Sequence, residues 1–314
     1  MKHKDKTGVV LLLVMMGLLL GEVRAASGNA DQRAAELANA SRYDAVYALF
    51  DSDPGTYAHW AAYLLSHRIP PRGTEYALGA SDVYGAEIAC RYRQANKEAE
   101  AYCLNQLNLI ARWKDADPRV ASALPKVKLP EISSNEIAER LRQLAAEGVP
   151  YAVYIANRRD LGLLEGLVEK APYSLGGQLA AGYLALRYWE EGNYEKALRY
   201  AFKSPGVSGG AAGVLAWAEY TGTQVARNQA NACNRANFWA IRTLNGPATY
   251  TLGMCYLEGA GGFPKDPVEA YGIFWMGRQN SSYEGFAKRL EELEKTLTPQ
   301  QLKEGRERGA KRFQ

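Results

Sequence analysis

Apolar residues recur at three- and four-residue spacing along most of this chain, which is the period of an amphipathic helix. The clearest segments are residues 34–50, 57–66, 136–147 and 284–296. No run shows the sustained apolar-polar alternation that indicates a half-buried strand. Turn-forming residues interrupt the pattern at 53–55, 70–71, 117–118, 125–130, 203–210 and 261–264. The sequence therefore predicts an all-α fold of short helices stacked as antiparallel hairpins, an α/α solenoid.

The first 25 residues have the composition of a signal peptide. Lys2, Lys4 and Lys6 precede an apolar run at residues 9–20, and residues 23–25 place small side chains where a signal peptidase cleaves. That run is shorter than the roughly 18 apolar residues of a membrane-spanning helix, and no later run reaches this length. A lipid-anchored protein carries a cysteine directly after such a run, whereas the first cysteine here is Cys90. We therefore expect a soluble periplasmic protein with no lipid anchor and no membrane insertion.

Charge argues against two classes of partner. The chain has 38 Lys and Arg residues against 34 Asp and Glu residues. Removal of the predicted signal peptide takes away four basic and two acidic residues, which leaves 34 against 32. Both signs are interleaved from end to end, without the basic stripe that recruits nucleic acid or anionic membrane. We therefore expect no nucleic-acid partner and no membrane partner.

The chain has four cysteines, an even number that suits disulfide pairing in an oxidising compartment. Cys90 and Cys103 lie equidistant from a break in the helical pattern at residues 94–96, and Cys233 and Cys255 lie equidistant from the turn beside residue 245. In an antiparallel hairpin, residues equidistant from the turn lie at the same height, within disulfide reach. The spacing predicts the pairs Cys90–Cys103 and Cys233–Cys255, with four buried thiols as the alternative.

The clearest repeat unit occupies residues 248–275. Three residues at four-residue spacing form one face of a first helix, and two glycines follow where the chain must turn with positive φ. An aspartate then caps a second helix, in which a small alanine allows close packing. This unit resembles the Sel-one-like repeat, a relative of the tetratricopeptide repeat with a longer, glycine-rich turn. The resemblance rests on Ala248, Leu252, Gly253, Tyr256, Gly259, Gly261, Asp266, Ala270 and Trp275.

Weaker copies of this unit precede it. Residues 212–232 follow the same pattern, with Gln224 at the second turn glycine and Asn228 at the capping aspartate. Residues 180–197 resemble a plain tetratricopeptide hairpin, and residues 86–102 a degenerate one. Thr298 and Pro299 fit the N-cap and first residue of a last helix. We therefore expect an N-terminal helical region at 26–130, a repeat solenoid at 131–286 and capping helices at 287–314.

One motif suggests catalysis. Residues 206–210 match the G-x-S-x-G pattern in which Ser208 would be a nucleophile, but that motif requires a preceding strand, and none is predicted. Only His59 and His67 follow the predicted leader, and their spacing does not suit zinc on one helix face. The acid pairs 190–191 and 291–292 diverge by about 100° on a helix, so neither pair converges on one substrate atom. We expect no catalytic site, no metal site and no cofactor.

The resemblance implies a function in binding another protein, because stacked hairpins present a broad surface to a peptide or a folded domain. Secreted Sel-one-like proteins include immunity proteins against type VI secretion phospholipase effectors, scaffolds of polysaccharide export and flagellar-motor proteins. Irregular repeats favour the first class, a toxin-binding immunity protein, with an envelope scaffold or adaptor as the alternative and a Ser208 hydrolase as the last choice. The candidate contacts with the partner are Arg158, Arg159, Tyr183 and Tyr188.

Overall fold

The computed structural model describes residues 30–67, 69, 81–114 and 118–313. All regular structure in these ranges is helical and they contain no strand, so the all-α prediction is confirmed. The predicted signal peptide, residues 1–25, lies outside the described residues. None of the described helices is both long enough and apolar enough to cross a membrane.

The breaks that lie within the described residues fall at or between helix ends, as their turn residues predict, while the break at residues 70–71 lies outside the described residues. Asp53 caps α3 by accepting from Thr56 N at 3.2 Å, and Thr298 opens the last helix with a capping box. In chain order the helices are residues 30–39, α2 (Tyr43–Ser52), α3 (Pro54–Ser66), α4 (Ser81–Arg91), α5 (Lys97–Trp113), α6 (Pro118–Ala123), the 3₁₀ turn η2 (Leu124–Lys126), α7 (Ser134–Ala146), α8 (Pro150–Ala156), α9 (Leu161–Lys170), α10 (Leu175–Glu190), α11 (Tyr194–Ala201), α12 (Gly209–Thr221), α13 (Gln229–Thr243), α14 (Gly246–Glu258), α15 (Pro267–Asn280), α16 (Glu284–Glu294) and α17 (Pro299–Arg312).

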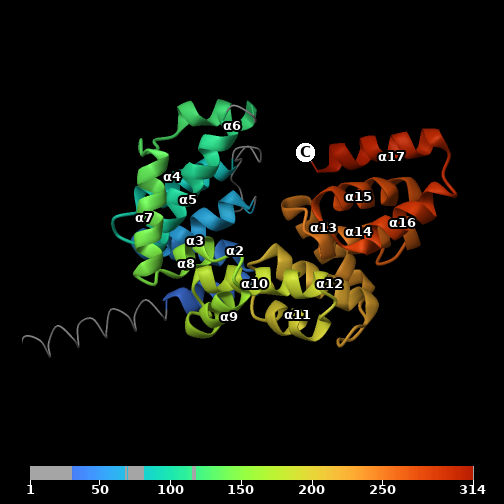
Figure 1. Cartoon of the computed structure of the whole chain (residues 1–314), viewed down its shortest axis with the longest axis horizontal. Coiled ribbons are helices and arrows are strands. Elements are labelled where there is room, and N and C mark those ends of the chain that lie inside the picture. Colours follow the sequence, from blue (N-terminus) through green and yellow to red (C-terminus); the bar gives the residue numbers. More distant parts are fainter. Residues whose placement is uncertain (1–29, 68, 70–80, 115–117, 314) are drawn as a thin grey trace, which may run out of the picture.

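The middle of the chain is built from two rows of helices. Helices α8, α10, α12 and α14 pack on one another in turn and form the first row. Helices α9, α11, α13 and α15 form the second row; each of α9, α11 and α13 contacts two successive helices of the first row, and α15 contacts α14. This arrangement is an α/α solenoid. In Figure 1 the chain bends, so that α4–α7 and α13–α17 form two arms rising from the same side of α9–α12.

The N-terminal helices fold back onto the middle of the solenoid. Tyr63 of α3 donates its hydroxyl proton to the Val207 carbonyl oxygen at 2.7 Å, and Tyr43 of α2 donates to the Gly206 carbonyl oxygen at 2.9 Å. The Asn39 side chain accepts from Gly206 N at 3.2 Å. A Cβ at Gly206 would lie 2.2 Å from the Ala38 carbonyl oxygen, so only glycine permits this approach. These contacts join residues more than a hundred positions apart.

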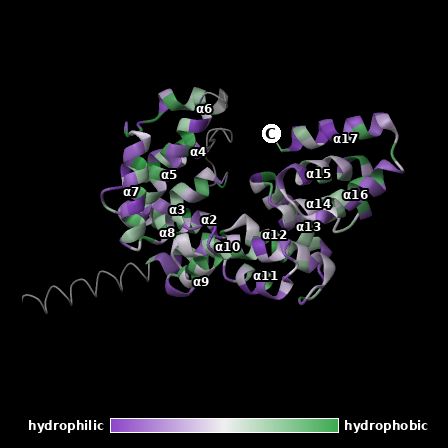
Figure 2. Cartoon of the chain, viewed as in Figure 1, coloured by the Kyte–Doolittle hydropathy of each residue, from purple (hydrophilic) through white to green (hydrophobic). Residues whose placement is uncertain are grey.

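One large core extends from the helix of residues 30–39 to α15, and two smaller clusters flank it. Trp60, Tyr63 and Tyr102 fill the N-terminal part of this core, and Trp189 fills its middle. The second cluster extends from α12 to α17, around Tyr271, Phe274 and Phe286. Figure 2 shows α17 as mostly hydrophilic along its length, which suits a helix that covers the end of a stack.

Helix α17 packs on α15 through glycines. A Cβ at Gly272 would lie 2.0 Å from the Gly305 carbonyl oxygen, and a Cβ at Gly309 would lie 2.4 Å from the Gly272 carbonyl oxygen. The obstructing atoms belong to the backbone and cannot rotate away, so the two helices approach only where side chains are absent. The glycines on both helices therefore set the distance between α15 and the last helix.

We expect Gly272→Ala to lower the free energy of unfolding by about 1–3 kcal/mol, because the added methyl group must push the two backbones apart. Urea unfolding followed by circular dichroism measures this change. Gly166→Ala on α9 is the matched control, because a Cβ there meets nothing within 4 Å. That control should be neutral or stabilising by up to about 1 kcal/mol. Equal losses in both variants would contradict the packing argument.

Candidate functional site

The residues of the clearest repeat unit lie on α14, on α15 and in the turn between them, in structural positions. Ala248 and Leu252 are fully buried, and a Cβ at Gly253 would lie 2.3 Å from Phe274 Cε1, so this glycine lets α15 pack closely. Ala270 is fully buried, while Trp275 is half-buried. The half-buried Tyr256 ring packs edge-on against Phe263, with ring centroids 5.2 Å apart. These side chains hold the hairpin together.

The turn between the two helices has the geometry that its glycines allow. Gly259 and Gly261 have φ of 70° and 63°, and Asp266 accepts from Val268 N and Glu269 N at 3.0 Å. In the upstream copy Gln224 keeps a left-handed φ of 58°, although it replaces a glycine, and Asn228 caps α13 through Asn231 N. The weaker copy therefore keeps the turn and the cap after losing the residues most typical of them.

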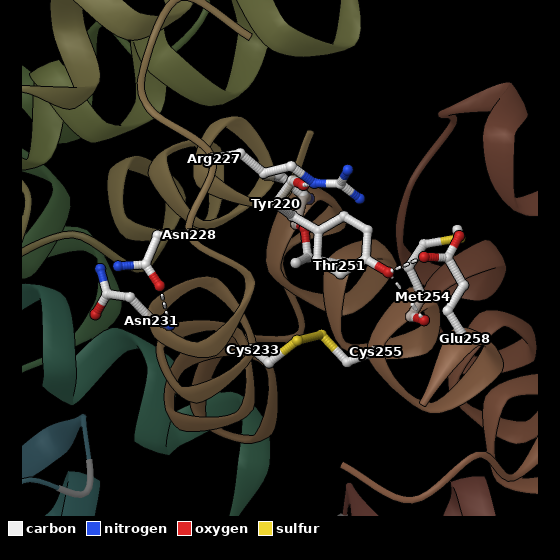
Figure 3. Close-up of a disulfide and its surroundings, with 10 residues drawn as sticks. Tyr220, Arg227, Asn228, Asn231, Cys233, Thr251, Met254, Cys255 and Glu258 are labelled. Atoms are coloured by element: carbon white, nitrogen blue, oxygen red, sulfur yellow. Dashed lines mark hydrogen bonds between the residues drawn. A yellow bond between two sulfur atoms is a disulfide. The ribbon is translucent and has the colours of Figure 1, made fainter. Parts of the chain in front are cut away.

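Two disulfides join paired helices, as the spacing predicts. Cys90–Cys103 links α4 to α5 with Cα atoms 4.8 Å apart, and Cys233–Cys255 links α13 to α14 with Cα atoms 5.9 Å apart. Figure 3 shows the second bridge beside Tyr220, whose hydroxyl donates to Glu258 Oε2 at 2.6 Å. The alternative of four free thiols does not hold, because every cysteine is paired.

The two candidate tyrosines differ in exposure. Tyr188 is buried, donates its hydroxyl proton to Glu165 Oε1 at 2.8 Å and stacks on Tyr200 with centroids 5.9 Å apart. Burial and the Glu165 hydrogen bond raise the pKa of Tyr188 to about 12. Tyr183 is half-buried on the same helix, α10. The Tyr188 contacts join α9, α10 and α11, so this side chain belongs to the packing between helices.

The two candidate arginines lie on the surface, in the turn between α8 and α9. Residues 155–161 line an open hollow of about 510 Å³ there, and both guanidinium groups are exposed. Arg158 lies over the Tyr154 ring, 4.8 Å from its centroid, while Arg159 forms no hydrogen bond or ion pair with any described residue. Leu163, in the first turn of α9, is 52% exposed. Asp160, which also lines the hollow, accepts from Leu163 N at 3.0 Å, so the exposed leucine follows directly after the turn that carries the two arginines.

The serine motif at residues 206–210 has a packing explanation. A Cβ at Gly182 would lie 1.8 Å from Ser208 Oγ, so the buried serine side chain points at α10. Cβ atoms at Gly209 and Gly210 would lie 2.6 Å from Thr243 Oγ1 and from the Gly182 carbonyl oxygen. Ser208 has an ordinary extended φ of −99°, unlike the strained nucleophile of an elbow. Within the described residues, no hydrogen bond joins its hydroxyl to a histidine.

The paired acids lie apart, as helix geometry predicts. Glu190 accepts from Arg187 Nη1 at 2.8 Å, whereas Glu191 is exposed. Glu291 pairs with Lys295 and Glu292 pairs with Arg289, each at 2.7 Å. Across the part of the chain that the structure describes, no three His, Cys, Asp or Glu side chains are grouped to hold a metal ion.

The structure contains a buried polar cluster, Asp31, His59 and Glu98, that the sequence pattern does not predict. His59 Nε2 lies 3.0 Å from Asp31 Oδ1, which also accepts from Trp60 Nε1 at 2.9 Å. Burial acts to lower the pKa of His59, but the Asp31 hydrogen bond and the charges of Asp31 and Glu98 outweigh it, so this pKa is raised. Its members come from residues 30–39, α3 and α5, and no spacing in the sequence predicts that they meet.

Glu98 is the most unusual member of this cluster. Its Oε2 accepts from Tyr151 N at 3.0 Å, at the start of α8, and it stands in the first turn of α5. Both helix starts favour a negative charge, each by roughly 0.3–1 kcal/mol. Burial opposes ionisation with a penalty of several kcal/mol and raises the pKa of Glu98 to about 7, although nearby His59 acts to lower it. The desolvation of the carboxylate therefore outweighs both helix dipoles.

Comparisons with known proteins find similarity at the level of the three-dimensional structure. No protein-family model matches the sequence, and no curated protein matches it. The chain is similar to the crystal structure of c5321, a protective antigen present in uropathogenic Escherichia coli strains displaying an SLR fold. The two share 16% sequence identity with a TM-score of 0.40, over 90% of this chain and 68% of that one. The fold assignment above rests on the helix rows themselves.

We expect Cys233→Ser with Cys255→Ser to lower the free energy of unfolding by about 3 kcal/mol, because the bridge restricts the unfolded chain over 22 residues. Urea unfolding without reductant measures this loss. The pair Cys90→Ser and Cys103→Ser, which opens a 13-residue loop, should cost a similar amount. With dithiothreitol, the wild type should lose the stability of both bridges, and a stability unaffected by reductant would contradict their role.

Proposed function

We propose that this chain is a non-catalytic, protein-binding repeat protein of the periplasm, and that it neutralises a phospholipase effector delivered by type VI secretion. The observation that carries the proposal is the exposed turn between α8 and α9, where Arg158 and Arg159 line a hollow and Leu163 follows in the first turn of α9; we call these three residues the α8–α9 surface. It combines guanidinium groups with an exposed aliphatic side chain. Arginine is enriched among the residues that contribute most to protein interfaces.

The α8–α9 surface suits a partner that presents carboxylates around an apolar contact. A guanidinium group binds a carboxylate through two parallel hydrogen bonds, which fixes both position and orientation. Arg159 forms no ion pair with a carboxylate among the described residues, so a partner would displace no such pair there. Tyr154 lies against Arg158 and limits the motion of its side chain, which lowers the entropy lost on binding.

Two further observations support the choice of compartment and partner. Paired cysteines suit an oxidising compartment such as the periplasm. The resemblance of residues 248–275 to the Sel-one-like repeat narrows the class, because secreted proteins of this kind include immunity proteins against phospholipase effectors. By analogy with that group, the partner would be bound with its active-site entrance covered.

The proposal is tested by capture and inhibition. Tagged residues 26–314 are mixed with a periplasmic extract, and each captured protein is then purified and assayed for phospholipase activity on lipid vesicles. The immunity function predicts a captured phospholipase whose activity falls to background at one equivalent of this chain. Capture of export or motor components, with no enzyme inhibited, would instead establish an envelope scaffold and refute the immunity function.

We expect the double charge reversal Arg158→Glu with Arg159→Glu to weaken binding of that phospholipase at least about 30-fold, since it replaces attraction with repulsion at a buried contact. Isothermal titration calorimetry measures the loss. Lys303→Glu with Lys311→Glu is the matched control, because it changes net charge equally at exposed residues of α17. An equal loss in the control would mean that overall charge, and not the α8–α9 surface, determines affinity.

A further inference from the structure

The Glu98 carboxyl group of α5 is buried beside the start of α8. Its residue is only 8% exposed, and Oε2 accepts the Tyr151 backbone proton, so Glu98 of α5 caps a helix other than its own. Oε1 is buried without a hydrogen-bond partner among the described residues. A buried carboxylate oxygen with no donor is costly, whereas the neutral acid leaves no charge to solvate. The burial of Oε1 without a donor therefore favours the protonated form, and it opposes the Tyr151 hydrogen bond, which favours the charged form.

We propose that Glu98 is a buried proton-binding site that fastens α8 to the α3–α5 pair, and that its neutral form holds them more firmly. The site connects these elements directly. The Glu98 carboxyl group holds the start of α8, and its neighbour His59 holds Asp31 of residues 30–39. The site thus makes the stability of the N-terminal half depend on pH.

The other ionisable groups around Glu98 come from each element that packs there. Residues 30–39 supply Asp31, and α3 supplies His59, whose Nδ1 lies 3.3 Å from Asn96 Nδ2. Helix α8 supplies the Tyr151 phenol, which Arg158 and Glu98 both influence, and Tyr102 of α5 lies against that ring. The remaining charged groups have other partners. Arg140 of α7 pairs with Glu100, and Glu147, the C-cap of α7, pairs with Lys97. Asp82 of α4 acts on Tyr102.

The direction of the pH effect follows from the proton affinities. Burial raises the pKa of Glu98 from 4.5 to about 7, so the folded chain binds this proton about 300-fold more tightly than the unfolded chain. The resulting stabilisation is complete below about pH 4.5 and is lost as the pH rises through about 7. The raised pKa of His59 acts in the same direction. His67, whose pKa burial lowers, acts in the opposite direction, because its contribution is lost as the pH falls.

The test compares residues 26–314 with the variant Glu98→Gln, in which an amide keeps the acceptor for Tyr151 N and removes the titration. Between about pH 5 and pH 8, the melting temperature of the wild type should fall by about 5 °C more than that of the variant. Glu100→Gln is the matched control on the same helix, and it should keep the wild-type slope. His67 is common to all three proteins and cancels. Equal slopes in wild type and Glu98→Gln would overturn the proposal.

A second measurement does not depend on the folding of the variant. The ¹³C chemical shift of the Glu98 carboxyl group, followed by nuclear magnetic resonance in the wild type, reports its protonation directly. An apparent pKa above about 6 supports the site, and one below about 5 overturns it. His59→Gln should move the Glu98 titration to higher pH, because the positive charge that lowers this pKa is removed.

Discussion

The contact with residues 206–207 holds the N-terminal helices against the middle of the solenoid. In a simple solenoid each hairpin touches only its neighbours along the chain. Here Tyr43 and Tyr63 donate to carbonyl groups of a turn that follows α11, and the second of these bonds spans 144 residues. Helices α5 and α8 lie between the two sides of this contact, because α5 packs on α3 and α8 packs on α10. The position of the α8–α9 surface therefore depends on a contact made elsewhere.

The same contact explains why a catalytic motif occurs in a packing turn. The G-x-S-x-G pattern at residues 206–210 needs small residues, and so does a turn into which three helices press. Gly206 faces the Ala38 carbonyl oxygen, and Ser208 faces Gly182. Glycine and serine at these positions satisfy the requirement for small side chains both in a catalytic turn and in a packing turn. Only the neighbouring elements distinguish a catalytic turn from a packing turn, and the elements described around residues 206–210 are helices.

The sequence predicted the parts of the fold that local physics determines. Turn glycines, capping residues such as Asp266 and the cysteine pairs all act within a single hairpin, so their spacing along the chain is informative. Asp31, His59 and Glu98 were not grouped, because they meet only through the packing of separate helices. Tyr188 is a predicted partner contact that proves to be a packing residue. Aromatic residues have the same helical spacing whether they face a partner or a neighbouring helix, so the spacing alone does not separate the two.

Helix α8 joins the proton site to the α8–α9 surface. It has only seven residues and no side-chain N-cap of its own, and so short a helix is unstable in isolation. Pro150 at its first position lacks an amide proton that would need a partner, and Glu98 accepts the next one. Just beyond its other end Arg158 lies on the ring of Tyr154. Because tertiary contacts order this short helix, loss of the Glu98 contact at its first turn would favour local opening of α8, including the Tyr154 ring on which Arg158 lies.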